Sequence, residues 1–152
     1  MKPTVYLATD HAGFALKNAV KAYLENELSY PVVDCGAHDY NGEDDYPDFI
    51  AKAAESIKNE PQNRAIIFGG SGQGEAMVAN KYAGVRATVY YGGSAEIITL
   101  SREHNDANAL SLGARFVTED EAYQVVSTWL AAPFSNEERH QRRLDAFRTL
   151  GA

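Results

Sequence analysis

The fold is decided by the stretch Ala65-Ile66-Ile67-Phe68-Gly69-Gly70-Ser71-Gly72-Gln73-Gly74-Glu75-Ala76-Met77-Val78-Ala79-Asn80-Lys81. The apolar run at its start predicts a buried parallel strand, and the segment after the glycines favours a helix. Between these two elements, four glycines surround one serine, so backbone N–H groups can point into a common concavity at the start of the helix. Such a loop can hold a phosphate or a developing oxyanion.

Glu75 comes directly after the last glycine of this loop. An anion-binding loop gains nothing from an added negative charge unless that charge takes part in chemistry. We therefore interpret Glu75 as a candidate general base. The loop would supply the donors that stabilise the negative charge which this base creates.

Strand and helix patterns alternate along the whole chain. Strands are expected at 4–8, 32–36, 65–68, 84–90 and 109–112, and helices at 14–24, 46–57, 73–81, 94–102, 118–131 and 135–150. This alternation predicts one three-layer, Rossmann-like α/β domain over residues 1–152, with a five-stranded parallel sheet and helices on both faces. Capping-box patterns at Thr118 and Ser135 are expected to begin the last two helices. Because no strand follows it, the C-terminal helix is expected to reach a partner subunit.

Composition and charge narrow the class of protein. The chain has 152 residues, of which 45% are hydrophobic and 23% charged, as in globular domains. It has no spanning apolar run, no signal-peptide pattern and a single cysteine, Cys35, so we expect a cytoplasmic protein without a membrane partner. A net charge of −7 argues against nucleic acid as the main partner. An acidic protein that binds an anion must concentrate its few arginines locally.

Polar residues follow the first and last expected strands. Asp10 and His11 come after the first strand, and Arg115 comes after the fifth. In open α/β sheets, ligands bind at the carboxyl ends of the strands, where these residues and the glycine loop would meet. The alternative for Asp10 is a cap for the following helix.

Two further groups could contact an anionic ligand. Arg139 and Arg143 are four residues apart, so one face of the last helix could present both guanidinium groups to a phosphate. The alternative is a solvent-exposed amphipathic face. His104 could move a proton near neutral pH and Asn105 could bind a sugar hydroxyl, but His104 could equally cap the end of its helix.

Other functions of the glycine loop are less consistent with its spacing. The pattern is G-x-G-x-G and no acidic residue ends the next strand, so a dinucleotide site is disfavoured. The loop lacks the Gly-Lys-Ser/Thr ending of a nucleotide P-loop, and no ordered set of metal ligands is evident, so no cofactor or metal is expected. Ser71 lies outside any G-x-S-x-G elbow, which favours hydrogen bonding to a substrate oxygen over nucleophilic attack.

Taken in order, the motifs resemble the type B ribose-5-phosphate isomerase family, which includes galactose-6-phosphate isomerase subunits. The similarity extends over nearly the whole chain. The motifs are Asp10-His11-Ala12-Gly13-Phe14, Tyr46-Pro47, Gly70-Ser71-Gly72-Gln73-Gly74, Ala79-Asn80-Lys81, Ser101-Arg102-Glu103-His104-Asn105 and Arg139-His140-Gln141-Arg142-Arg143. The resemblance implies metal-independent aldose–ketose isomerisation by dimers, or tetramers of dimers, whose active sites use residues from two subunits.

The resemblance also implies roles for individual residues. His104 would be the acid that helps to open the furanose ring, and Glu75 the base, because this chain has Gly69 where many members carry a cysteine base. Sugar and phosphate contacts would come from Asp10, His11, Gly70, Ser71, Gly72, Gln73, Gly74, Asn105, Arg115, Arg139 and Arg143. The expected substrate is ribose 5-phosphate. A tetrose or hexose phosphate, or a non-catalytic role in binding sugar phosphates, remains as an alternative.

Overall fold

A five-stranded parallel sheet forms the centre of the computed structural model, which describes residues 1–151. The strands lie in the order β2-β1-β3-β5-β4, which confirms the predicted α/β class. Their bounds are β1 Val5–Thr9, β2 Val32–Asp34, β3 Arg64–Gly69, β4 Ala87–Tyr90 and β5 Ala109–Gly113. The order reverses between β1 and β3, since the chain first adds β2 on one side of β1 and then places β3 on the other. Such a switch point opens a crevice at the carboxyl ends of the two strands.

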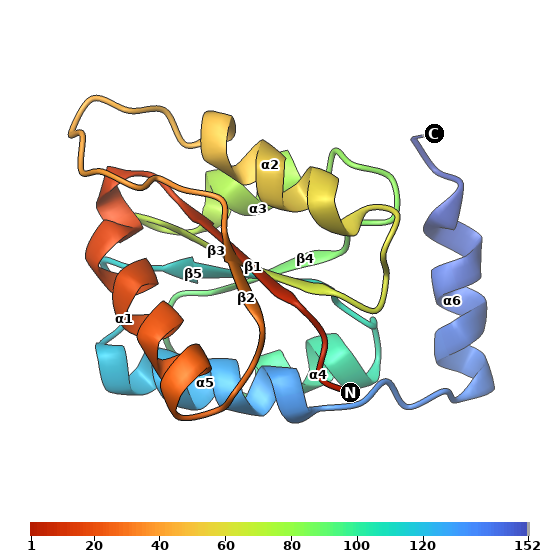
Figure 1. Cartoon of the computed structure of the whole chain (residues 1–152). Helices are drawn as coiled ribbons and strands as arrows, with labels where there is room; N and C mark the ends of the chain where they lie inside the picture. The colour runs from red at the N-terminus through yellow and green to blue at the C-terminus, as the bar shows by residue number, and fades with distance from the viewer. Residues whose placement is uncertain (152) are drawn as a thin grey trace.

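Helices cover both faces of the sheet (Figure 1). α2 (Pro47–Ile57) and α3 (Gln73–Ala79) lie on one face, and α1 (Phe14–Asn26), α4 (Glu96–Glu103) and α5 (Glu119–Ala131) lie on the other. The short 3₁₀ helix η1 (His11–Gly13) precedes α1, and α6 (Glu138–Arg148) stands beside the layers. None of the helices described within residues 1–151 is long and apolar enough to cross a membrane.

The central strand β3 explains why this arrangement has two cores. Successive side chains of a strand point to opposite faces. Ile66 and Phe68 therefore pack with α1, α4 and α5, whereas Ala65 and Ile67 pack with α2 and α3. A strand buried on both faces must be apolar at consecutive positions, as this strand is.

One predicted helix start is confirmed and one is wrong. Thr118 caps α5, because its Oγ1 accepts a hydrogen bond of 3.1 Å from Glu121 N. The expected capping box at Ser135 does not form, and α6 begins only at Glu138. Ser135 Oγ instead accepts from Glu137 N and lies 2.7 Å from His140 Nδ1. The side chain that could have capped the helix therefore contacts a buried histidine of the same helix.

Two expected strands are longer than the observed ones. The second ends at Asp34, because Gly36 has a φ of +100° and its N donates to Asp34 Oδ1. Backbone bonds to β1 nevertheless continue past this end, since Cys35 N donates to Leu7 O at 2.7 Å. The fourth begins at Ala87, since Gly84 has a φ of +83° and Val85 N closes a turn on Tyr82 O. Both differences lie at strand ends, next to a glycine with a positive φ.

A buried ion pair fixes the end of β2 to α1. Lys17 is fully buried, and its Nζ donates to Asp34 Oδ1 and to Ala37 O, both at 2.7 Å. Asp34 Oδ1 also accepts from Gly36 N at 2.9 Å. The Lys17 ammonium group thus joins the first helix to the beginning of the loop that leads towards α2.

Candidate active site

The glycine loop lies at the carboxyl end of β3, as expected. Gly72 has a φ of +79°, which favours glycine, and its carbonyl accepts a 2.6 Å hydrogen bond from Ser111 Oγ. A Cβ at this position would lie 3.0 Å from Ser111 Oγ and 3.1 Å from Gly113 N. The loop therefore passes directly over the end of β5, and α3 begins at Gln73.

The Glu75 carboxyl group lies against the backbone of Gly69. Glu75 is 4% exposed and belongs to the first turn of α3. A Cβ built on Gly69 would lie 1.7 Å from Glu75 Oε1 and 2.0 Å from its Cδ. The carboxyl group therefore fills the space that any side chain at position 69 would occupy.

This environment changes the acidity of Glu75. Burial raises the pKa of the Glu75 carboxyl, and the negative charge of Asp10 raises it further, while the backbone N–H of Glu75 partly opposes the change. A raised pKa brings a carboxyl group closer to the range in which a general base works best.

Asp10 and His11 follow β1 and lie on the same edge of the sheet. Asp10 is 7% exposed and caps η1, because its Oδ1 accepts a 2.9 Å hydrogen bond from Ala12 N. The capping role weighed for this residue is therefore observed, alongside the electrostatic contact with Glu75. His11 bonds through both its backbone N and its ring Nδ1 to Asp44 Oδ1, at 2.9 and 2.7 Å.

Sequence reasoning missed Asp44. It lies in the acidic loop between β2 and α2, which carries other carboxylates at Asp39, Glu43 and Asp45. Nothing in the spacing distinguishes Asp44 from these neighbours. Donor atoms of Asp10, His11 and Asp44 lie within 4.8 Å of one another, a spacing open to a metal ion. His11 and Asp44 are, however, already hydrogen-bonded to each other.

Arg115 and Tyr46 border the same loop. A Cβ on Gly70 would lie 2.9 Å from Arg115 Nη1, and Arg115 N donates to Gly70 O at 3.1 Å. A Cβ on Gly74 would lie 2.5 Å from the hydroxyl oxygen of Tyr46. A side chain at Gly74 would therefore collide with the Tyr46 ring, whereas one at Gly70 would press on the flexible end of Arg115. The site at this edge combines Glu75, Asp10, Arg115, Tyr46 and the glycine loop.

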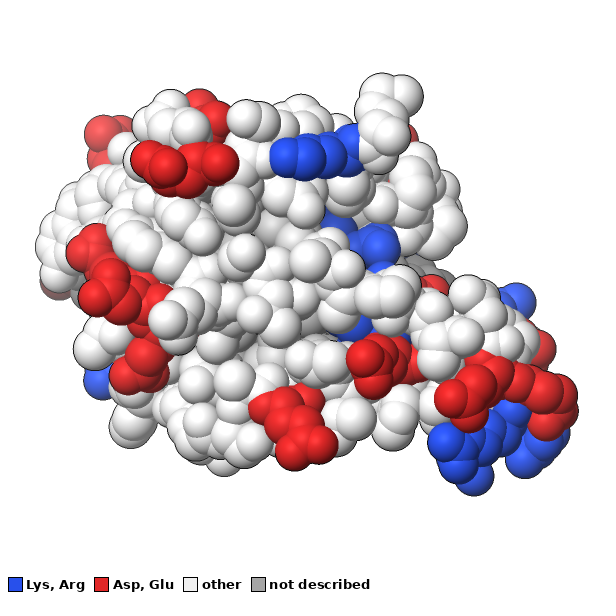
Figure 2. Space-filling model, turned by 90° about the horizontal axis from the view of Figure 1, so that it is seen from below, with Lys and Arg blue, Asp and Glu red and all other residues white. Residues whose placement is uncertain are grey.

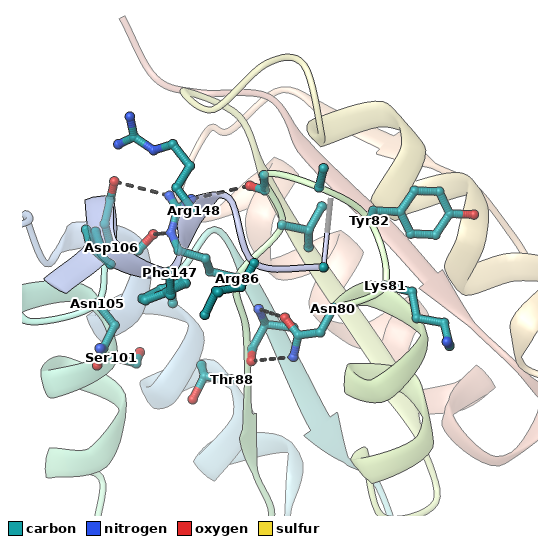
Figure 3. A pocket seen from close by; sticks show the side chains of 18 of the residues that line it. Asn80, Lys81, Tyr82, Arg86, Thr88, Ser101, Asn105, Asp106, Phe147 and Arg148 are labelled. Atoms are coloured by element: carbon teal, nitrogen blue, oxygen red, sulfur yellow. Dashed lines mark hydrogen bonds and ion pairs between the residues drawn. The ribbon is translucent and has the colours of Figure 1, made fainter.

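The other predicted residues lie at the opposite edge of the sheet. His104 is the C-cap of α4, with its backbone N donating to Leu100 O, and its ring lies 4.2 Å from the ring of His140 on α6. Burial, followed by the neighbouring His104, lowers the pKa of His140. Asn105 lines a cavity of about 910 Å³ between α6 and the start of β4 (Figure 3). Strands start at this edge, whereas the glycine loop lies where they end.

Arg139 and Arg143 lie on the exposed surface of α6. Arg139 pairs with Glu137 at 2.9 Å, although both side chains are more than half exposed. On the same helix, His140 and Leu144 are buried, whereas Phe147 is 41% exposed. In a single chain, the α6 arginines do not join Glu75, because the helix stands beside the opposite end of the sheet.

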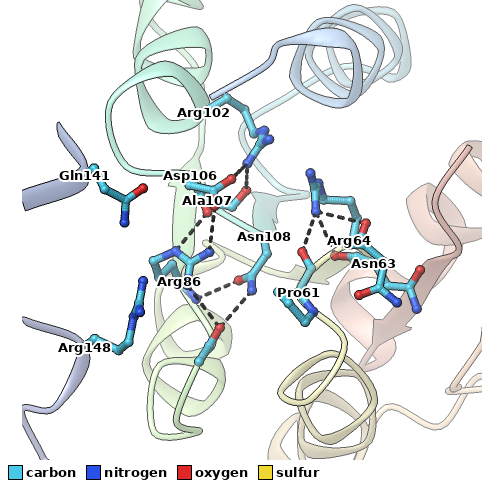
Figure 4. Close-up of polar contacts among 12 residues, drawn as sticks. Pro61, Asn63, Arg64, Arg86, Arg102, Asp106, Ala107, Asn108, Gln141 and Arg148 are labelled. Atoms are coloured by element: carbon cyan, nitrogen blue, oxygen red, sulfur yellow. Dashed lines mark hydrogen bonds and ion pairs between the residues drawn. The ribbon is translucent and has the colours of Figure 1, made fainter. Parts of the chain in front are cut away.

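An arginine network holds the turn that carries His104 and Asn105 (Figure 4). Arg102 is 4% exposed, and its Nη1 donates to Asp106 Oδ1 and Ala107 O at 2.8 and 2.7 Å. Arg86 Nε donates to Asp106 O at 2.9 Å.

Basic side chains gather on this side of the molecule. Burial, and then the charge of Arg102, lower the pKa of the neighbouring Arg64 to about 10. Most basic side chains visible in Figure 2 also lie on the side of the molecule towards α6.

The fold and this site define an α/β enzyme with a glycine-rich loop and a buried carboxyl group at the carboxyl edge of a parallel sheet. The family model described as Ribose/Galactose Isomerase matches residues 5–147. Ribose-5-phosphate isomerase B of Mycolicibacterium paratuberculosis is 43% identical over 93% of this chain and 87% of its own length. The chain therefore belongs to the ribose/galactose isomerase family.

Solved structures agree with this assignment. Ribose-5-phosphate isomerase B from Mycoplasma genitalium with bound ribulose-5-phosphate has a TM-score of 0.91 and 37% identity, covering 97% of this chain and 95% of that one. The ribose 5-phosphate isomerase of Thermotoga maritima has a TM-score of 0.90 and 33% identity, covering 99% and 100%.

Proposed function

We propose that this protein interconverts ribose 5-phosphate and ribulose 5-phosphate, with Glu75 as the base. The observation that carries the base assignment is the position of the Glu75 carboxyl group, which is buried beside Gly69 and the anion-binding loop. The names of the relatives and the bound ribulose-5-phosphate of one of them support the choice of substrate.

The chemistry moves one proton from C2 to C1 and a second proton from the C2 hydroxyl oxygen to O1. Glu75 removes the proton from C2 of the open-chain aldose and returns it to C1, so a single carboxylate on one face of the sugar serves as acceptor and donor. The intermediate is an enediolate, whose negative charge needs fixed donors. The loop amides and the Ser71 hydroxyl supply them, and losing one such donor typically costs about 2.7–4 kcal/mol of transition-state stabilisation.

The remaining residues bind and open the sugar. Asp10, His11, the loop from Gly70 to Gly74 and Arg115 hold the substrate at the Glu75 edge. His104 donates the proton that opens the furanose ring, Asn105 binds a hydroxyl, and Arg139 with Arg143 grips the phosphate. Gripping the phosphate fixes the reacting carbons against the base, which lowers the entropic part of the barrier.

These roles require a homodimer with shared sites, since the two groups of residues lie at opposite edges of one sheet. One subunit supplies Glu75 and the loop, and its partner supplies His104 and the arginines. α6 is the element that reaches across, because its arginines are exposed in the single chain. The reaction is placed in the cytoplasm, in keeping with the unpaired, half-buried Cys35.

Exchange of the substrate proton with solvent tests the base assignment. Glu75→Gln keeps the shape of the side chain but removes its basicity, so we expect loss of C2 proton exchange, measured by NMR in deuterium oxide, in a folded protein. Glu55→Gln, on the exposed surface of α2, is the matched control and should exchange normally. Full exchange by Glu75→Gln would refute the assignment.

A panel of aldose phosphates assayed with a chelator present identifies the substrate. Ribose 5-phosphate should be turned over most efficiently. Preference for a galactose-type hexose phosphate would keep the chemistry and change the substrate. A protein that binds these sugars without converting them would contradict the proposed activity.

A further inference from the structure

Asp44 restrains His11 at two points, which is more than His11 would need if it only bound substrate. Asp44 Oδ1 lies 2.9 Å from the His11 backbone N and 2.7 Å from its ring Nδ1. The Asp44 side chain is 8% exposed and the His11 side chain 26%. One carboxylate oxygen therefore holds both the backbone and the ring of His11.

The chemistry of the two groups determines which ring nitrogen of His11 carries a proton. An ionised carboxylate offers only lone pairs, so at this distance His11 Nδ1 must carry the proton. The ring nitrogen left without this partner is Nε2, on a side chain that remains partly exposed. The Tyr40 ring lies edge-on to the imidazole, with ring centres 6.2 Å apart and planes at 89°, which further limits rotation of the ring.

Folding alone does not explain the carboxylate. Asp44 Oδ2 is buried and has no hydrogen-bond partner within residues 1–151, which costs free energy. An asparagine could accept the bond from His11 N equally well through its Oδ1. What a carboxylate adds, and an amide does not, is the requirement for a proton on Nδ1.

We propose that Asp44 is a positioning residue of the active site, which fixes the tautomer and orientation of His11 so that Nε2 meets the sugar phosphate. This role rests on the proposed function, because His11 is assigned to the substrate there. Asp44 acts through His11, in the way that a buried aspartate orients the imidazole of a hydrolase triad.

Asp44→Asn is the direct test, with Asp45→Asn, an exposed carboxylate in the same loop, as the matched control. Nitrogen-15 NMR of the imidazole should show a protonated Nδ1 in the starting protein and in Asp45→Asn. In Asp44→Asn the amide can rotate, so the tautomer with the proton on Nε2 should become populated. We expect kcat/KM to fall by about 10–100-fold, the range of a lost hydrogen bond to a charged group, with an unchanged circular dichroism spectrum.

A double variant separates positioning from a structural effect. If Asp44 acts through His11, Asp44→Asn should cost almost nothing further in a His11→Ala background. An equal loss in both backgrounds, or an unchanged tautomer in Asp44→Asn, would overturn the role of Asp44. The tautomer is measured without substrate, so a starting protein that shows this tautomer but lacks isomerase activity would instead contradict the proposed function.

Discussion

At the scale of single residues, the site depends on positions 69 and 75, whose side chains would occupy the same space. The Glu75 carboxyl group occupies the space in which a side chain at position 69 would lie. A base on the helix after the loop therefore requires glycine at the end of β3. The resemblance implies that many family members carry a cysteine base at position 69. A cysteine at position 69 and a glutamate at position 75 would compete for the same space, which explains why a chain would carry only one of them.

Gly69→Ala should inactivate the enzyme without unfolding it. The new Cβ would lie 1.7 Å from Glu75 Oε1, so the carboxyl group must move away from the loop. Displacing a base by about 1 Å can cost roughly 10²-fold in rate, and the loss should appear mainly in kcat.

Gly42→Ala is the matched control for this replacement. Its added Cβ would approach nothing closer than the Tyr40 hydroxyl oxygen at 3.7 Å, an ordinary contact. Steady-state kinetics should leave Gly42→Ala unchanged. Wild-type kcat in Gly69→Ala would show that the carboxyl group does not work from the observed position.

At the scale of elements, hydrogen bonds and ion pairs of buried charged side chains hold the segments that carry the site. Arg102 fixes the turn after α4, and the Lys17–Asp34 pair fixes the end of β2 against α1. Burial alone would raise the pKa of Asp34, but hydrogen bonds from Lys17 and Gly36 N and the charges of Lys17 and Lys21 outweigh it and lower the pKa. A lowered pKa means that the ionised carboxylate stabilises the fold.

Asp34→Asn should reduce the free energy of unfolding by about 2–3 kcal/mol at pH 7. This is less than the loss typical of a broken buried pair, because Ala37 O still accepts from Lys17. The stabilisation by Asp34 is present above its ordinary pKa of 3.8 and is lost as pH falls through the lower value of the folded state. Urea unfolding should therefore show the difference between the proteins shrinking in acid.

Asp39→Asn, in the loop after β2, controls for the loss of a negative charge, since Asp39 is exposed. Its unfolding midpoint should match that of the starting protein. If Asp34→Asn also matched it at neutral pH, the buried pair would contribute nothing to stability.

At the scale of the whole molecule, the parallel sheet separates the proposed catalytic groups. Glu75 and the loop lie where strands end, whereas His104, Asn105 and α6 lie where strands begin. A site that uses both groups can form only between copies of the chain. In a twofold dimer, each copy then contributes to two sites.

Mixing two impaired variants tests this arrangement. Glu75→Gln should be inactive, and the Arg139→Ala/Arg143→Ala double variant should be weakly active at low substrate because it binds the phosphate poorly. After co-refolding, half of the dimers are mixed and each has one intact site, so we expect about a quarter of the normal activity. Glu75→Gln mixed with Asp10→Asn is the control without recovery, because both changes affect the same half. Equal activities for the two mixtures would contradict shared sites.

The α/β class, the parallel sheet and the glycine loop at its carboxyl edge could all be predicted from the amino-acid sequence. These features depend on local signals: apolar runs of strand length, helical periodicity and glycines placed directly after a strand. The sequence also placed Asp10, Arg115 and Glu75 on one edge, because strand ends in a parallel sheet meet at the same side. The false capping box at Ser135 shows where such patterns fail, because the Ser135 hydroxyl group contacts the buried ring of His140, five residues further along the chain.

The side chains that come into contact across the site could be identified only from the folded chain. The contact of Glu75 with Gly69, the bond of His11 to Asp44 and the packing of His104 on His140 join residues whose spacing follows no local pattern. The position of α6 beside the opposite end of the sheet could not be predicted from the sequence either. Periodicity specifies which face of an element is buried, but the partner that buries it is chosen by packing between segments distant in the chain.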